Sequence, residues 1–282
     1  MTLTIGSLFT GIGGLDLAVE EFFGAKTAWF SEIEPAAVKV FEHHNPGVPN
    51  LGDITKIDWT TAPRVDIMCG GSPCQDMSTA GVRAGMLNGT RSGLWENMRE
   101  GIATLRPKYV VWENVKGAYS AKAYSEMERT EGRVGGIRAL GRVVGDLASL
   151  GYDCRWGVVR ASDAGAPHRR ERVFLLAASA DAALSRQRGG RTVGEAATRA
   201  RHFEGTTYPC SGSWGEALED ADTKYGKNIN IKFVEQIMGL TPGYTDANTS
   251  WSSRLLMLAN GVVPQQALLA LELLTGEHCE VS

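Results

Sequence analysis

Short hydrophobic stretches alternate with amphipathic ones along the first two thirds of the chain. Runs rich in β-branched and aromatic residues, bounded by glycine or polar residues, are typical of buried strands. Such runs occupy residues 4–9, 27–32, 65–69, 109–113, 156–160 and 173–178. Apolar positions three and four apart predict helices over residues 13–23, 35–43, 93–105 and around 137–147. This alternation predicts an α/β fold in which helices cover both faces of a mostly parallel sheet.

The pattern changes near residue 180. Residues 181–230 are rich in Gly, Thr, Ser and Arg and have little periodicity, whereas a clear helical pattern returns over 263–274. We therefore predict a main domain, a small inserted lobe and a C-terminal return to the main domain, over residues 1–180, 181–250 and 251–282.

Composition narrows the class of protein. With 43% hydrophobic and 22% charged residues, the chain can bury a sizeable core, which excludes a disordered or fibrous protein. No apolar run approaches the roughly 18 residues of a membrane span, and residues 1–5 do not resemble a secretory signal. The five cysteines are irregularly spaced, and no pair has zinc-binding spacing. We expect a cytoplasmic protein without membrane contact, disulfide framework or metal.

A glycine-rich turn, residues 7–15 (SLFTGIGGL), joins the first predicted strand to the first helix. Gly11 and Gly13 allow a tight turn and a close approach of the backbone to a ligand. Glu32 ends the next strand, where a carboxylate can bind both hydroxyls of a ribose. Asp53, near the expected end of a third strand, could bind an adenine amino group. The alternative is a purely structural turn with a surface glutamate. Because the turn is not GxGxxG, an adenosine-bearing cofactor such as S-adenosylmethionine is favoured over a dinucleotide.

The most informative stretch leads to Cys74. A hydrophobic strand runs into Gly-Gly-Ser-Pro-Cys, which would display the thiol at the carboxyl end of the strand, where ligands bind in open α/β sheets. Backbone N–H groups there favour a thiolate. Free cysteines are usually buried and inert, which is our interpretation of Cys69, Cys154 and Cys279. The Gly-Gly-Ser-Pro lead-in favours a nucleophilic role for Cys74.

Glu113 ends another apolar strand, which a parallel arrangement would place on the same sheet edge as Cys74. A carboxylic acid held protonated there could donate a proton, although a helix cap or a salt bridge is the commoner fate of a glutamate. Arg170 and Arg172 precede the strand over 173–178, so we expect them to bind a ligand or to form salt bridges. The alternative for this basic cluster is a solvated face.

In this order, these motifs resemble those of the cytosine-C5 DNA methyltransferase family along nearly the whole chain, from Ser7 to Leu274. SLFTGIGGLD resembles the family's cofactor motif, GGSPCQDMS its Pro-Cys-Gln loop and WENV its Glu-Asn-Val motif. APHRRERVFLLA is similar to its Gln-Arg-Arg-x-Arg motif and ANGVVPQQA to its closing Gly-Asn-x-Val-x-Pro motif. The chain departs from the pattern at Ser72 (Pro or Phe is usual), His168 (Gln) and Ala259 (Gly), which leaves loop closure and cofactor fit open.

The resemblance implies a Rossmann-like S-adenosylmethionine-dependent methyltransferase fold with a small target-recognition lobe. It makes Cys74 the nucleophile and Glu113 the acid on the N3 and N4 edge of cytosine, supported by Arg170 and by Arg172 near O2. The residues implied to line the cofactor pocket are Phe9, Gly11, Gly13, Glu32, Asp53, Ile54 and Asn260. Those implied to form a mobile loop on DNA are Gln75, Ser78 and Arg91.

The implied reaction transfers a methyl group to C5 of a cytosine that has left the double helix. Addition of the Cys74 thiolate to C6 makes C5 nucleophilic, and loss of the C5 proton later expels the thiolate. Flipping the base takes a few kcal/mol, so other contacts must replace those it loses.

A basic stretch would read the DNA. Residues 155–201 contain ten arginines and four acidic residues, a local charge of +6 in a chain of net charge −3. Arg186, Arg188 and Arg191 are candidates for phosphate or guanine contacts, and a solvated Arg-Gly loop is the alternative. We expect a monomeric, compact prokaryotic or phage enzyme that acts on a short site in double-stranded DNA. A paired restriction nuclease is compatible with this interpretation.

Two other functions stay open. A tRNA cytosine-C5 methyltransferase would share the catalytic core, and the Val-Lys-Gly after Glu-Asn is compatible with it, but the Cys-Phe-Thr signature of that branch is missing from the sequence. A catalytically idle DNA-binding relative is the other. Retention of Cys74, Glu113 and Arg172 together argues against it.

Overall fold

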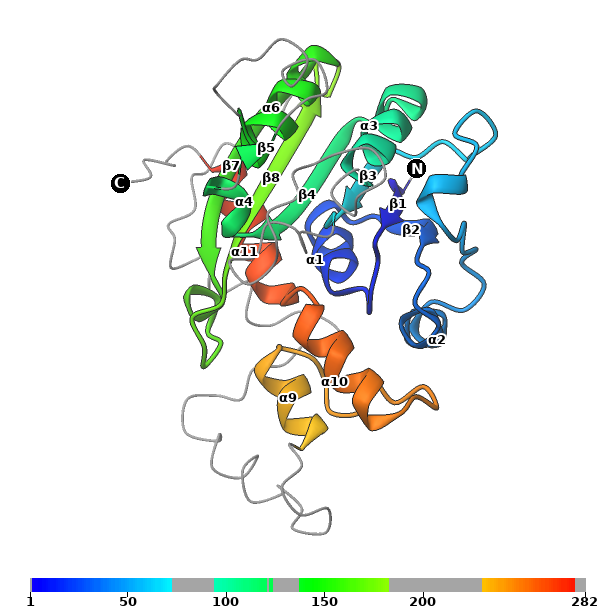
Figure 1. The fold of residues 1–282 in the computed structure, drawn as a ribbon, viewed down its shortest axis with the longest axis vertical. Helices are drawn as coiled ribbons and strands as arrows, with labels where there is room; N and C mark the ends of the chain where they lie inside the picture. The colour runs from blue at the N-terminus through cyan, green and yellow to red at the C-terminus, as the bar shows by residue number, and fades with distance from the viewer. Residues whose placement is uncertain (1, 73–93, 121, 124–136, 183–229, 277–282) are drawn as a thin grey trace.

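The computed structural model describes residues 2–72, 94–120, 122–123, 137–182 and 230–276. Its centre is a six-stranded sheet in the order β2-β1-β3-β4-β8-β7 (Figure 1). The strands are β1 (Thr4–Leu8), β2 (Lys26–Ser31), β3 (Ile67–Gly70), β4 (Tyr109–Val115), β7 (Tyr152–Arg160) and β8 (Glu171–Ser179). Strands β2, β1, β3 and β4 run parallel to one another, and β8 is antiparallel to both β4 and β7. The predicted mostly parallel α/β sheet is confirmed.

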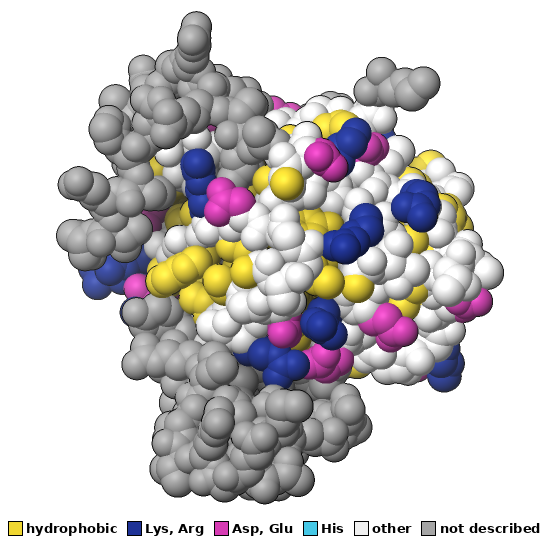
Figure 2. Space-filling model, turned by 90° about the horizontal axis from the view of Figure 1, so that it is seen from above, with side chains coloured by type: hydrophobic (Ala, Val, Ile, Leu, Met, Phe, Trp, Pro, Cys, Tyr) yellow, Lys and Arg dark blue, Asp and Glu magenta, His cyan; other side chains and the backbone are white. Residues whose placement is uncertain are grey.

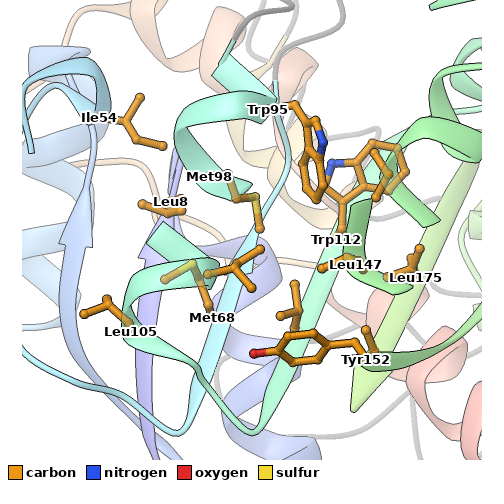
Figure 3. Packing of buried hydrophobic residues seen from close by; sticks show 14 of the residues in the cluster. Leu8, Ile54, Met68, Trp95, Met98, Leu105, Trp112, Leu147, Tyr152 and Leu175 are labelled. Atoms are coloured by element: carbon orange, nitrogen blue, oxygen red, sulfur yellow. The ribbon is translucent and has the colours of Figure 1, made fainter. Parts of the chain in front are cut away.

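Helices cover both faces of this sheet, because its strands are apolar on both sides. On β8, Val173 and Leu175 join the core under α3 (Leu94–Leu105) and α6 (Ala139–Ser149). Phe174 and Leu176, which point the other way, pack with α1 (Gly14–Phe23) and α11 (Pro264–Thr275). Figure 3 shows the first of these cores, in which Trp95, Met98, Trp112 and Leu175 lie together. Side chains that alternate along each strand therefore belong to two separate cores, one on each face of the sheet.

A third core joins the C-terminal helices to the cofactor-motif end of the chain. Helix α9 (Ile231–Ile237) and α10 (Trp251–Asn260) pack with α2 (Pro35–His44) and with Ile12 of the glycine turn. The predicted lobe over 181–250 falls mainly on residues 183–229, outside the described residues, so its boundaries stay a prediction.

One stretch of the described chain, Trp251–Thr275, is long and apolar enough to cross a membrane by length and composition. Residues 261–263 break it into α10 and α11. Helix α11 is buried along most of its length between α1 and the sheet, so its apolar composition is explained by the core of the fold.

The strand expected before Asp53 is not formed. A single parallel bridge joins Phe30 to Asn50, and the chain then leaves the sheet. Gly52 has a left-handed φ of 74°, and Asp53 caps the short 3-10 turn η1 (Ile54–Lys56) by accepting from Thr55. Local turn bonds of this kind compete with a strand ladder, which explains why the prediction was wrong here.

The structure also differs from the prediction in the start of one strand and in the elements that follow β4. Strand β7 starts at Tyr152, four residues earlier than predicted, since its first residues pair with the end of β8. Helix α4 (Gly117–Ser120) follows β4, and β5 (Lys122–Ala123) pairs with β6 (Ile137–Arg138).

Candidate active site

Three elements of the site meet at one edge of the sheet. In the parallel register Leu8 pairs with Gly70, and Gly70 pairs with Trp112. The glycine turn after β1, the Gly-Ser pair after β3 and Glu113 on β4 therefore lie at the carboxyl ends of adjacent strands, the usual ligand edge of such a sheet. Cys74 lies outside the described residues. Ser72, two residues before it in the sequence, is the last described residue of this segment.

Ser72 is tied to the strand that carries Glu113. The indole N–H of Trp112 donates a 3.1 Å hydrogen bond to Ser72 Oγ, and Asn114 Nδ2 donates a 3.0 Å bond to the Ser72 carbonyl. Both bonds are buried. The departure from Pro or Phe at this position thus supplies an acceptor that neither of those side chains has.

Gly71, directly after β3, lies against the side chain of Glu113. A Cβ atom added there would lie 2.8 Å from Glu113 Oε2. Any larger residue would push the acid away, so the glycine is needed for contact rather than for its φ angle.

Glu113 is buried and ion-paired. Its residue is 8% exposed, and Arg172 Nε lies 3.0 Å from Oε1. Burial raises the pKa of Glu113, and the charges of Arg172 and Arg170 oppose that rise. Both sequence-based expectations for Glu113, a salt bridge and an acid with raised pKa, are thus found in the same group. Because burial disfavours its charged form, this carboxyl group is suited to donate a proton.

Arg170 holds the backbone around Asn260. Its two terminal nitrogens each donate a 2.7 Å hydrogen bond, one to the Ala259 carbonyl and one to the Gly261 carbonyl. Burial, followed by the nearby Arg172 charge, lowers the pKa of Arg170 to about 10. Arginine near a helix C-terminus stabilises the last carbonyl groups, here those of α10. Because the contact is to the Ala259 carbonyl, the side chain at position 259 can vary.

His168 has a similar bridging role. Its Nε2 lies 2.9 Å from the Ile237 carbonyl at the end of α9, and the Arg170 N–H donates to Nδ1 at 3.4 Å. Burial lowers the pKa of His168, so the ring is neutral and Nε2 carries the proton. The imidazole joins the arginine motif to the C-terminal helices.

The glycine turn has an unusual backbone. Three of its residues, Phe9, Gly11 and Gly13, have left-handed φ angles of 53°, 57° and 82°. The Glu32 carboxylate accepts backbone N–H bonds of 2.8 Å from Gly11, Ile33 and Glu34. Glu32 therefore connects the turn to the start of α2 and keeps its carboxylate at the sheet edge.

Asn260 comes close to this turn through the residues that follow it. A Cβ on Gly14 would lie 2.3 Å from the Val262 carbonyl, and a Cβ on Gly261 would lie 3.4 Å from the Ile12 side chain. Residues 248 and 249 positions apart in the sequence thus meet, as the cofactor assignment requires. Asn260 itself is exposed.

The two residues after Gly52 differ in character. Asp53 Oδ1 accepts from the Thr55 amide and hydroxyl, which are the largest causes of its lowered pKa. Ile54 is buried in the core under α3. Their assignment to the adenine end of the cofactor stays a prediction.

Two residues at the site were not identified from the sequence. Ile33, next to Glu32, is 70% exposed. The sequence pattern that could have identified it is an isoleucine between two acidic residues at the end of a strand. Asp16 in the first turn of α1 is only 4% exposed, and neither carboxylate oxygen has a hydrogen-bond partner in the part of the chain described. Burial raises the pKa of Asp16 to about 7. Nothing in its local sequence distinguished it from a helix-capping acid.

The remaining predicted site residues cannot be placed. Outside the described ranges lie Cys74, Gln75, Ser78, Arg91, Arg186, Arg188 and Arg191. On the face that Figure 2 shows, basic and acidic side chains of the described residues are interspersed. The arginine-rich reading surface stays a prediction.

The chain is similar to known DNA methyltransferases in sequence. Residues 3–261 match the family model described as C-5 cytosine-specific DNA methylase. Type II methyltransferase M.NlaIV of Neisseria lactamica is 34% identical over 173 residues, which are 60% of this chain and 39% of that protein. Orphan methyltransferase M.SPRI of Bacillus phage SPR is 32% identical over 177 residues, 62% of this chain and 37% of that protein. The matched region thus spans about two fifths of the length of these relatives.

The fold is also that of solved methyltransferases. A protein named as a DNA modification methyltransferase encoded within a prophage (E. coli) matches with a TM-score of 0.61 at 17% identity, over 96% of this chain and 98% of that chain. A mutant of Spodoptera frugiperda DNMT2 matches with a TM-score of 0.63 at 16% identity, over 96% of this chain and 99% of that chain. At such identity the likeness concerns the fold alone, and it confirms the Rossmann-like methyltransferase fold. Because the family model covers almost the whole chain and its motifs meet at one sheet edge, this protein belongs to the C-5 cytosine-specific DNA methylase family.

Proposed function

We propose that this protein is a DNA (cytosine-5-)-methyltransferase that transfers a methyl group from S-adenosylmethionine to C5 of a flipped cytosine. The observation that carries the proposal is the buried Glu113–Arg172 pair beside Ser72, two residues before Cys74. A thiol and a proton donor on adjacent strand ends are what addition to an aromatic pyrimidine requires.

In the proposed reaction the Cys74 thiolate forms a bond to C6 of cytosine. Glu113 donates its proton, or a hydrogen bond, to N3, which accepts the displaced electron pair and leaves C5 nucleophilic. Arg172 orients the Glu113 carboxyl and lies near the cytosine O2. C5 would gain its methyl group from S-adenosylmethionine, which would leave as S-adenosylhomocysteine. Any proton on N3 returns to Glu113, and loss of the C5 proton to a base then restores the C5–C6 double bond and expels the thiolate.

The residues present fit S-adenosylmethionine. Glu32 would hold the ribose hydroxyls, the N–H groups at the start of α1 and the exposed Asn260 would receive the methionine end, and Ile33 offers an apolar surface for the adenine. When bound, this cofactor supplies an electrophilic methyl group on a sulfonium. Three backbone N–H bonds keep the Glu32 carboxylate in place for such a role.

We propose double-stranded DNA as the substrate of a cytoplasmic, monomeric enzyme. Type II and orphan methyltransferases both occur among the relatives, so a cognate restriction nuclease is one of two arrangements that fit. Arg186, Arg188 and Arg191 are the proposed DNA-reading arginines, within a recognition lobe over residues 181–250.

The test uses purified protein with radiolabelled S-adenosylmethionine on duplex DNA and on tRNA, followed by bisulfite sequencing of host DNA after expression. Methylated cytosines in duplex DNA are expected, and transfer to tRNA alone would overturn the DNA assignment. Duplex DNA with 5-fluorocytosine at the mapped site should trap the wild type covalently.

Cys69 offers a matched control for the trap. It is fully buried on β3, and burial raises its pKa well above the usual value of a thiol. Cys74→Ala should abolish trapping, whereas Cys69→Ala should preserve it. Trapping by the Cys74→Ala protein would remove Cys74 from the mechanism.

A further inference from the structure

Tyr244 contacts the glycine turn from the far end of the chain. Its hydroxyl donates a 3.0 Å hydrogen bond to the carbonyl of Ile12, which is 232 positions earlier in the sequence. The residue is 6% exposed, and its ring stacks on His44 of α2 with centroids 3.9 Å apart and an interplanar angle of 13°. The Tyr244 carbonyl in turn lies 2.8 Å from His44 Nε2.

The contact falls on the peptide that sets the direction of the turn. Gly13 N–H, on the same peptide as the Ile12 carbonyl, donates to the Thr10 carbonyl at 3.0 Å. The first helical bond starts one residue later, from Leu17 N–H to the Gly13 carbonyl. Gly13 has a φ of 82°, and glycine permits this planar unit to rotate at little cost. With Tyr244 in place, both polar atoms of the peptide are held.

Tyr244 is itself held on both sides. The fully buried Glu235 carboxylate accepts the N–H of Gly243 at 2.5 Å and that of Thr245 at 2.9 Å. Arg254 from α10 pairs with Glu235 at 3.0 Å, and the Thr245 hydroxyl bonds to it as well. Burial raises the pKa of the Tyr244 phenol, so it remains a donor at any working pH.

We infer that Tyr244 is a positioning residue for cofactor binding, whose hydroxyl holds the Ile12–Gly13 peptide so that the turn and the start of α1 are shaped for S-adenosylmethionine. The inference rests on the proposed function. Tyr244 acts through the turn and contacts neither Glu113 nor Arg172 among the contacts described. Its loss should therefore weaken cofactor binding and leave the rate of methyl transfer at saturation nearly unchanged.

The test compares Tyr244→Phe with Tyr152→Phe. Tyr152 is 5% exposed and donates a 2.7 Å bond to the Pro107 carbonyl at the opposite edge of the sheet, so it loses the same phenol–carbonyl bond far from the turn. Calorimetric titration with S-adenosylhomocysteine should show about tenfold weaker binding for Tyr244→Phe and no change for Tyr152→Phe. The KM for S-adenosylmethionine should rise by a similar factor, with kcat within about twofold.

A second variant guards against a folding defect. His44→Gln removes the stacked ring but keeps the Tyr244 hydroxyl, and it should weaken S-adenosylhomocysteine binding about twofold to threefold. Equal affinity of wild type, Tyr244→Phe and His44→Gln would overturn the inference. Failure of the wild type itself to bind S-adenosylhomocysteine would instead refute the proposed function, so the two failures are distinguishable.

Discussion

The two sides of the candidate active site are stabilised in different ways. The acid side, Ser72, Glu113 and Arg172, consists of side chains on or beside regular strands that contact one another directly. The cofactor side, the glycine turn with Glu32 and Asn260, is held through backbone groups in left-handed or helix-end conformations.

This difference has consequences for how each side responds to change. On the acid side, a single substitution removes a whole functional group. Its effect should therefore appear in the rate of the chemical step. On the cofactor side, several distant residues share the task of holding a few peptide groups, so single effects should be smaller and should appear in binding.

The largest effect is expected on the acid side. Glu113→Gln keeps the shape of the side chain but removes the proton donor, so kcat should fall by roughly 10²–10⁴-fold while DNA affinity stays within a few-fold. Single-turnover methylation and a DNA-binding titration measure the two quantities. Glu171→Gln on the neighbouring strand β8 is the control, since Glu171 pairs with Lys116 at the surface. Unchanged turnover of Glu113→Gln would exclude the acid from the mechanism.

The second effect concerns the pH dependence of stability on the cofactor side. Burial raises the pKa of Asp16 to about 7, above the usual aspartate value of 3.8. Between these values the unfolded chain loses the proton first, so the Asp16 contribution is complete at low pH and disappears as the pH rises to 7. Each pH unit in this window lowers the free energy of unfolding by about 1.4 kcal/mol.

Asp16→Asn should remove that cost. Urea unfolding at pH 5 and pH 7 should show the variant gaining roughly 2 kcal/mol on the wild type between the two conditions. Glu20 is the nearby acid to control for, since its charge adds to the rise at Asp16. A difference between variant and wild type that is the same at both pH values would show that Asp16 does not retain its proton.

A third effect tests the anchor before Cys74. Ser72→Ala leaves the buried indole N–H of Trp112 without its acceptor, which should cost about 1–3 kcal/mol in the free energy of unfolding and slow the covalent trapping step. Ser72→Thr keeps a hydroxyl and should recover most of both. Trp29→Phe, which removes a 2.9 Å indole bond to Pro63, should lower stability without slowing trapping. Equal trapping rates for all variants would leave Ser72 a purely structural residue.

The smallest effect is expected from Arg170→Lys. A lysine amine cannot bind the Ala259 and Gly261 carbonyls with the planar geometry of arginine, so Asn260 should be held less firmly. We expect S-adenosylhomocysteine to bind about threefold to tenfold more weakly by calorimetry. Arg155→Lys, which alters a 3.1 Å bond to the Leu274 carbonyl, should not change this affinity. A larger fall in kcat than in affinity would show that Arg170 acts with Glu113 and Arg172 in the chemical step.

The sequence was most informative where chemistry and periodicity coincide. Strands such as Tyr109–Val115 and helices such as Pro264–Thr275 follow from period-two and helical patterns, because both faces of the sheet need apolar cover. The placement of Glu113 next to the carboxyl end of β3 follows from the parallel register of β3 and β4 alone. Where local turn chemistry outweighed the apolar pattern, as at Asp53, the expected strand was wrong.

Other features were decided only by the tertiary structure. The pattern could not show that Ser72 accepts from Trp112, that Arg170 holds both carbonyls around Asn260, or that Tyr244 reaches Ile12. The buried state of Asp16, and with it the raised pKa, also depends on the packing of α1 against the sheet. Sequence by itself determined the family and the order of its motifs along the chain, and it predicted the reacting groups, since these are local properties of the chain. Hydrogen-bond partners and desolvation are set by groups that are distant in sequence and become neighbours only when the chain folds, so the three-dimensional structure alone could assign them.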